Sequence, residues 1–258
     1  MAETGDFGRP LPRINKITQD DISEALRRGM DDFKHEPTYG IVLAAVYVVG
    51  GLILAYIAFT ADMLVMLFPI SAGFALVGPF AAVTLYEVSR RRELGLKLDV
   101  WHVLGAIRSA SSGSIVMLGF VLFFALYVWV RVALLIYALF YGLAPVDFVT
   151  LLGEVVSTWQ GVMFFAVGNA VGALFALALF VVSVMSFPFL VDKEADFISA
   201  IMVSVSAVRR NPRVLFGWGV FVAFVLAVAI VPFFLGLFLA IPLLGHATWH
   251  LYRRTVAY

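Results

Sequence analysis

Long hydrophobic runs separated by short polar segments dominate the pattern of this chain. Four runs have at least the roughly 20 residues that cross a bilayer, and they occupy Gly40 to Phe59, Met63 to Leu85, Ser114 to Leu143 and Val162 to Leu190. A last run, Val214 to Leu251, is about twice as long as one span requires. We expect it to turn near Val231-Pro232-Phe233. The pattern therefore predicts an all-α membrane protein with six transmembrane helices.

Three polar segments resemble one another, and each starts with an aspartate that is expected to cap a helix: Asp21, Asp99 and Asp196. Sixteen residues after the first and the third stands a proline, Pro37 or Pro212, and Gly113 takes a similar place in the middle copy. Each segment is followed by two expected spans. This arrangement predicts a threefold repeat of an interfacial helix with two spans, in residues 21–86, 99–190 and 196–252.

The first two of these segments have one apolar and one charged helix face. In the first, Ile22, Leu26 and Phe33 share a face opposite Glu24 and Arg28. Such helices are typical of the headgroup plane, so we expect three amphipathic helices on the cytoplasmic side. The third copy is apolar nearly all round and is expected to tuck under the bundle. A further short amphipathic helix is expected on the outer side, between 143 and 161.

The distribution of basic residues predicts the orientation in the membrane. With six spans, every Lys and Arg except Arg131 falls on the same side as both termini. The positive-inside rule makes that side cytoplasmic. Residues 1–20 are then a cytoplasmic tail without a signal peptide, and 21–258 form a single membrane domain.

Composition narrows the class of function. The chain has 258 residues, of which 62% are hydrophobic and 14% charged, with a net charge of +1 and no cysteine. These values exclude a soluble enzyme, and the balanced charge argues against a nucleic-acid partner. The lack of cysteine excludes disulfides, iron–sulfur ligation and a thiol nucleophile.

Two histidines are candidates for binding a metal ion or haem. His246 and His250 are four residues apart, so both imidazoles lie on one helix face. No carboxylate stands beside them in the sequence to complete a site. We therefore favour interfacial histidines that bond to lipid phosphate or backbone carbonyls, and we expect no cofactor.

Polar residues inside the expected spans are further candidates. Arg131 is either a functional intramembrane charge or a residue that reaches the outer interface, paired with Asp147 or Glu154. Asn169 lies between Gly168 and Gly172, a small-xxx-small pattern that favours close helix packing.

A charged segment follows the second expected span. Glu87 is either part of a proton path or, as we favour, an ion-pair partner of Arg90. The cluster Arg90, Arg91 and Arg92 fixes topology and is a candidate site for anionic lipid.

Three motifs resemble the uncharacterised bacterial integral-membrane family known as domain of unknown function 2189: Tyr86-Glu87-Val88-Ser89-Arg90-Arg91-Arg92-Glu93, then Ala207-Val208-Arg209-Arg210-Asn211-Pro212 leading to Trp218-Gly219, and the tail Gly245 to Arg254 that contains Trp249. The resemblance covers most of the chain after residue 20. It implies a bacterial inner-membrane protein without established activity, and it supplies no catalytic residues. Some relatives carry a label as cytochrome c oxidase subunits, although the oxidase histidine set is missing here.

These observations favour a non-enzymatic accessory or scaffold component of a membrane complex, with a respiratory complex as one expected partner. The first alternative is a small-molecule transporter or lipid-handling protein in which Arg131 or Asn169 faces a cavity. The second is a haem- or metal-binding membrane protein that uses His246 and His250.

Overall fold

The computed structural model describes residues 12–60, 78–99, 112–143 and 146–257. The described chain is helical apart from one two-stranded ribbon, as the hydrophobic pattern predicts. In chain order the elements are β1 (Arg13–Ile14), α1 (Gln19–His35), α2 (Pro37–Thr60), α4 (Gly78–Ala81), α5 (Val83–Glu93), α7 (Ser112–Tyr141), α8 (Phe148–Ser157), α9 (Trp159–Ser183), α10 (Ser186–Asp192), α11 (Phe197–Arg210), α12 (Pro212–Ile230), α13 (Leu237–Thr255) and β2 (Val256–Ala257).

Four helical segments of the described chain are long and apolar enough to cross a membrane: Pro37–Thr60, Gly113–Tyr141, Trp159–Asp192 and Pro212–Ile230. They correspond to the first, third, fourth and fifth expected spans. The second expected span falls largely outside the described residues, so it stays a prediction. The expected sixth span is α13, which is not among the four. Its C-terminal half is polar, and most of α13 is buried against other helices of the protein.

The long last apolar run turns where the sequence predicts. Residues 231–236 form a series of turns between α12 and α13. Phe233 and Phe234 both have a positive φ, of 50° and 66°. At Gly236 an added methyl group would lie 2.6 Å from the Cα atom of Ala229, so only glycine allows the chain to return this closely.

The first and third of the three predicted repeat units share a local geometry. In both, a helix ends two residues before a proline that begins the next helix, with a single junction residue between them. The junction residues Glu36 and Asn211 have the same φ of −128°, with ψ of 61° and 48°. The helix-forming part of the middle copy lies at 100–111, outside the described residues, so the threefold repeat and the six-span count are not established.

The aspartates that open these two units have different roles. Asp196 caps α11, because its side chain accepts a hydrogen bond from the backbone nitrogen of Ser199. The sequence predicts that Asp21 is the N-cap of α1, and this prediction is wrong. Thr18 takes that position, and Asp21 accepts from the backbone nitrogen of Thr18 in a capping box.

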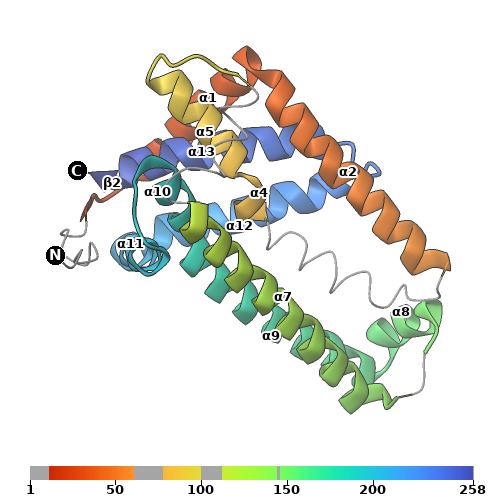
Figure 1. Ribbon diagram of the computed structural model, residues 1–258. Coiled ribbons are helices and arrows are strands. Elements are labelled where there is room, and N and C mark those ends of the chain that lie inside the picture. The colour runs from red at the N-terminus through yellow and green to blue at the C-terminus, as the bar shows by residue number, and fades with distance from the viewer. Residues whose placement is uncertain (1–11, 61–77, 100–111, 144–145, 258) are drawn as a thin grey trace.

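Helices α1 and α11 also contact the rest of the molecule. One face of α1 is covered by the protein, because Ala25, Gly29 and Asp32 are buried and α1 packs along α13 (Figure 1). Its place in the headgroup plane stays a prediction. Helix α11 is tucked in as expected, with Ala200 and Ala207 fully buried.

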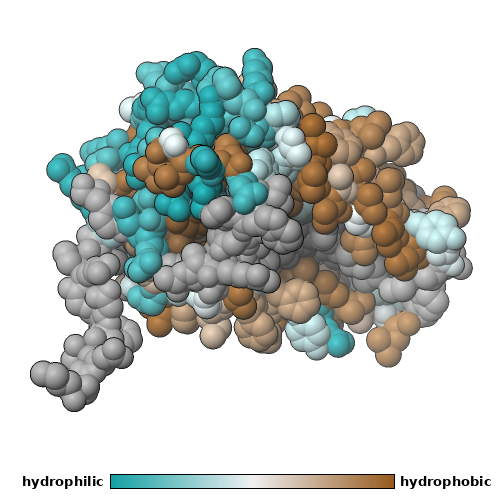
Figure 2. Space-filling view, turned by 45° about the horizontal axis from the view of Figure 1, so that its top comes forward, coloured by the Kyte–Doolittle hydropathy of each residue, from teal (hydrophilic) through white to brown (hydrophobic). Residues whose placement is uncertain are grey.

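The polar part of the molecule gathers at one end. Helices α1, α5 and α13 lie side by side there, and α2 and the α7–α9 pair extend away from it toward α8 (Figure 1). Hydrophilic residues cover this end, whereas hydrophobic residues cover the surface beyond it (Figure 2). The termini of the described chain meet at the same end, where β1 pairs antiparallel with β2.

The expected short amphipathic helix is α8. Asp147 caps it by accepting from the backbone nitrogens of Val149 and Thr150. Leu151 is buried, and Leu152 and Val156 are exposed.

Candidate functional site: a buried polar cluster

Helices α1, α5 and α13 approach one another closely because glycines stand at their contacts. A methyl group on Gly29 of α1 would lie 2.6 Å from the backbone nitrogen of Ala247 in α13. The side chain of Leu85 in α5 occupies the space that a methyl group on Gly245 of α13 would take. These contacts bring together polar side chains that are far apart in the sequence.

Asp32 is the centre of this cluster. Its side chain is only 6% exposed. Its Oδ2 atom accepts from Ser89 Oγ at 2.6 Å and from His250 Nε2 at 2.7 Å, and Arg92 donates to Oδ1. Burial raises the pKa of Asp32, but the hydrogen bonds from His250 and Ser89 outweigh burial, and the pKa lies below its usual value. The carboxylate is therefore ionised and joins all three helices.

His246 takes the next position in the network. Its Nδ1 atom lies 2.8 Å from Ser89 Oγ. Because the hydroxyl has one proton and gives it to the carboxylate of Asp32, it accepts from Nδ1–H of His246. The Nε2 atom is buried and makes no hydrogen bond within the described part of the chain. Burial lowers the pKa of His246 to about 4 despite the nearby charge of Asp32, so the imidazole is neutral at physiological pH.

The histidine pair therefore lies in a different environment from the one we favoured. His246 is fully buried and His250 is 9% exposed, and both face protein rather than lipid. The carboxylate that the local sequence lacks is supplied by Asp32 of α1. At 2.7 Å, Asp32 and His250 are hydrogen-bonded directly, without space for an ion between them. No group of His, Asp and Glu in the described ranges has the geometry of a metal site.

The charges of α5 are also compensated within the protein. Glu87 is buried and pairs with Arg90 Nε at 2.8 Å and with Arg91 Nε at 2.7 Å. Arg92 pairs with Asp31 at 2.8 Å and with Asp32. The favoured ion pair of Glu87 with Arg90 is thus present, and the arginine cluster faces carboxylates of its own chain.

A family model matches the middle of the chain, and the matched segment includes helix α5. Residues 67–192 match the model of DUF2189, described as predicted integral membrane protein. The resemblance is confirmed for this segment, which is just under half of the chain and includes Tyr86 to Glu93. The other two motifs lie outside it, so the match is narrower than expected. No curated protein matches the chain, and neither does any solved structure.

The tail motif lies outside the segment that DUF2189 matches. It packs on helix α5, which lies inside that segment. Trp249 is fully buried, and its Nε1 atom donates to Glu93 of α5 at 3.2 Å. Arg253 pairs with the same glutamate at 3.1 Å and with Asp192 of α10 at 3.3 Å. The tail therefore anchors α13 on both α5 and α10.

Arg131 lies far from the cluster, in the span Gly113–Tyr141. Its guanidinium is over the ring of Tyr127, 5.0 Å from the centroid. It forms no ion pair with Asp147 or Glu154 in the described structure; Asp147 is engaged at the start of α8. Arg131 is also about ten residues from the end of its helix, farther than the expected single turn.

Asn169 bonds to its own helix, since its amide donates to the carbonyl of Phe165 at 2.8 Å. The close helix contact predicted by the small-xxx-small pattern exists at Gly172, where an added methyl group would lie 2.9 Å from the ring of Trp129. Gly168 faces open space. Asn169 and Arg131 therefore do not join the cluster.

Sequence reasoning missed Asp32 and Ser89. A signal for Asp32 was present: it falls on the same helix face as Ala25 and Gly29, opposite the other charges of α1. A carboxylate on a face of small residues indicates a buried polar partner. Ser89 offered no such signal, because serine occurs on any helix face.

Proposed function

We propose that this integral membrane protein is a non-enzymatic component of a membrane complex, in which the polar end holds apolar spans against a partner. The observation that carries the proposal is a contrast in packing. The polar end is closely packed around Asp32, whereas three of the four candidate spans are only 17–22% buried inside the protein. Most of their surface is left for lipid or for the helices of another protein.

Span α2 illustrates this contrast. Small residues such as Ala44 and Gly51 face inward, and large apolar side chains face outward. The outward stripe includes Val42, Val46, Val49, Ile53 and Tyr56, each 53–69% exposed. Van der Waals packing is one of the forces that associate helices in a bilayer, and an apolar stripe on α2 can supply it to a partner helix.

The buried polar groups support a structural role for the cluster. Asp32 accepts three hydrogen bonds, and Glu87 pairs with two arginines. Their charges are used in contacts between helices. The polar side chains Arg131 and Asn169 contact their own helices, which gives less support to a transporter. The metal alternative receives less support because His250 already donates to Asp32.

Site-specific cross-linking from the outward stripe of α2 tests the proposal. A photoactivatable phenylalanine analogue would be placed at Val46 or Ile53, with the inward positions Ala44 and Val48 as matched controls. We expect the outward positions to form an adduct with one membrane protein, which mass spectrometry of the adduct identifies. A respiratory complex is one such partner. Adducts with lipid alone from every outward position would contradict the proposal.

A further inference from the structure

A second group of charges lies at the junction of α11 and α12, beside β1. Asn211 fixes this arrangement, because its side chain accepts from the backbone nitrogen of Ile17 and donates to the carbonyl of Asn15, both at 2.9 Å. The segment 13–17 is thereby held along the end of α11. Basic side chains from two distant parts of the chain come to the same region, Arg13 from β1 and Arg209 and Arg210 from the end of α11.

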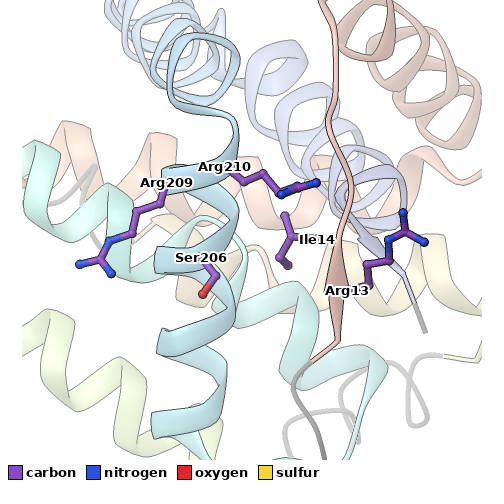
Figure 3. A pocket seen from close by; sticks show the side chains of 5 residues that line it. All are labelled: Arg13, Ile14, Ser206, Arg209 and Arg210. Atoms are coloured by element: carbon purple, nitrogen blue, oxygen red, sulfur yellow. The ribbon is translucent and has the colours of Figure 1, made fainter.

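A shallow hollow of about 540 Å³ opens between these elements. It is lined by Arg13, Ile14, Ser206, Arg209 and Arg210. Figure 3 shows Ile14 and Ser206 between Arg209 on one side and Arg13 on the other, with Arg210 extending from α11 toward β1. The guanidinium groups are spread around the hollow and do not converge on a single point.

These arginines differ from those of the polar cluster. Arg13, Arg209 and Arg210 are exposed, and none of them forms an ion pair in the part of the chain that the structure describes. By contrast, the arginines of α5 and the C-terminal Arg253 and Arg254 all pair with carboxylates. The C-terminus of α11 attracts Arg209 and Arg210 through the helix dipole. That attraction does not account for Arg13, which comes from β1.

The position of the hollow indicates its ligand. Pro212 begins the candidate span α12, so Arg209 and Arg210 stand immediately before a membrane-crossing segment. Lipid phosphates lie at that level of a bilayer, and each basic residue near an anionic surface contributes about 1 kcal/mol. We propose that Arg13, Arg209 and Arg210 bind the headgroup of an anionic phospholipid.

Thermal unfolding of the purified protein in a neutral detergent tests this site. Short-chain phosphatidylglycerol is titrated into the wild type and into the triple variant Arg13→Gln, Arg209→Gln, Arg210→Gln, with phosphatidylcholine and sodium phosphate as separate arms. The matched control, Arg27→Gln, Arg28→Gln, Lys34→Gln, removes the same charge from α1. Unfolding without lipid establishes that each variant is folded.

We expect phosphatidylglycerol to stabilise the wild type and phosphatidylcholine to have little effect. The triple variant should bind phosphatidylglycerol roughly a hundredfold more weakly, and the control should stay within about threefold of the wild type. Equal binding by the triple variant and the wild type, or an equal loss in the control, would overturn the site. If millimolar phosphate stabilised the protein as much as phosphatidylglycerol, the assignment of a lipid ligand would be overturned and the site would bind a soluble anion.

Discussion

The α1–α2 and α11–α12 units follow one plan and use it differently. Both consist of a helix, a junction residue with φ of −128°, and a proline that begins a candidate span. The first unit is attached to the rest of the protein through the carboxylate of Asp32. The second is attached through hydroxyls, since Ser204 donates to the carbonyl of Val181 at 2.7 Å and accepts from the backbone nitrogen of Met185 at 3.1 Å.

The two kinds of attachment have different consequences for charge. A buried carboxylate requires cationic and hydrogen-bonding partners, and Arg92 is the cationic partner of Asp32. A hydroxyl requires none, so Arg209 and Arg210 of the second unit stay available to a ligand. The same helix–proline–helix unit can thus hold the protein together or present charge at the membrane surface.

The largest effect is expected where the first unit depends on its carboxylate. Asp32→Asn keeps the shape of the side chain but removes its charge and replaces one of its two acceptor oxygens with an NH2 group, so Arg92 loses its ionic partner and at least one of the donors around Asp32 loses its acceptor. We expect a loss of about 3–5 kcal/mol in the free energy of unfolding, measured by denaturant titration in detergent. The matched control is Asp31→Asn, whose side chain is 55% exposed and pairs with the same arginine. It should cost less than about 1 kcal/mol.

Two glycine-to-alanine substitutions, one in each unit, provide the next test of the difference between the units. Gly29→Ala places a methyl group against the backbone of Ala247 and forces α1 away from α13, which should cost about 2–3 kcal/mol. Gly217→Ala in α12 is the matched control, because its nearest neighbour, the side chain of Gln19, lies 4.0 Å away. That change should be neutral or stabilising, since alanine favours a helix. Equal destabilisation by both changes would contradict the close contact.

The sequence predicts features that depend on neighbouring residues better than contacts between residues that are far apart in the sequence. The junctions at Pro37 and Pro212, the turn at 231–236 and the helix 148–157 follow from local signals, and all were predicted. The cluster was not, because Asp32, Ser89 and His246 meet only after three helices have packed. Contacts between distant segments also bear on α13, the expected sixth span: most of it is buried against other helices, α1 and α5 among them, and the six-span count is not confirmed.

The polar cluster that attaches the first unit should also be more sensitive to acid than the contacts of the second unit, because it includes His246 of α13. The pKa of His246 is about 4 in the folded protein, against 6.5 in the unfolded chain. The unfolded state therefore binds more protons between these values, and stability falls as the pH drops below about 6.5. At pH 5 the expected loss is about 2 kcal/mol relative to pH 7.5. Asp32 does not contribute in this window, because its lowered pKa costs stability only below about 3.8.

The acid effect is measured as the unfolding temperature in detergent between pH 7.5 and pH 5. His246→Asn retains a donor for Ser89 and removes the titrating group, so it should flatten the profile. His35→Asn changes an exposed histidine of α1 and should leave the profile unchanged. A wild-type profile that is already flat, or one that His246→Asn does not alter, would contradict the assignment.

The smallest effect is expected from the hydroxyl of the second unit. Ser204 stands between the carbonyl of Val181 and the nitrogen of Met185, four residues apart, and so interrupts the helix at the end of α9. In Ser204→Ala these two backbone groups can bond to each other, unlike the orphaned partners of Asp32. We therefore expect a cost of about 1 kcal/mol or less, together with a straighter α9–α10 segment. Distances between spin labels at Leu174 and Lys193, introduced as cysteines into this cysteine-free chain, would increase. A loss as large as that of Asp32→Asn would show that the second unit is also attached through a polar contact that its neighbours cannot replace.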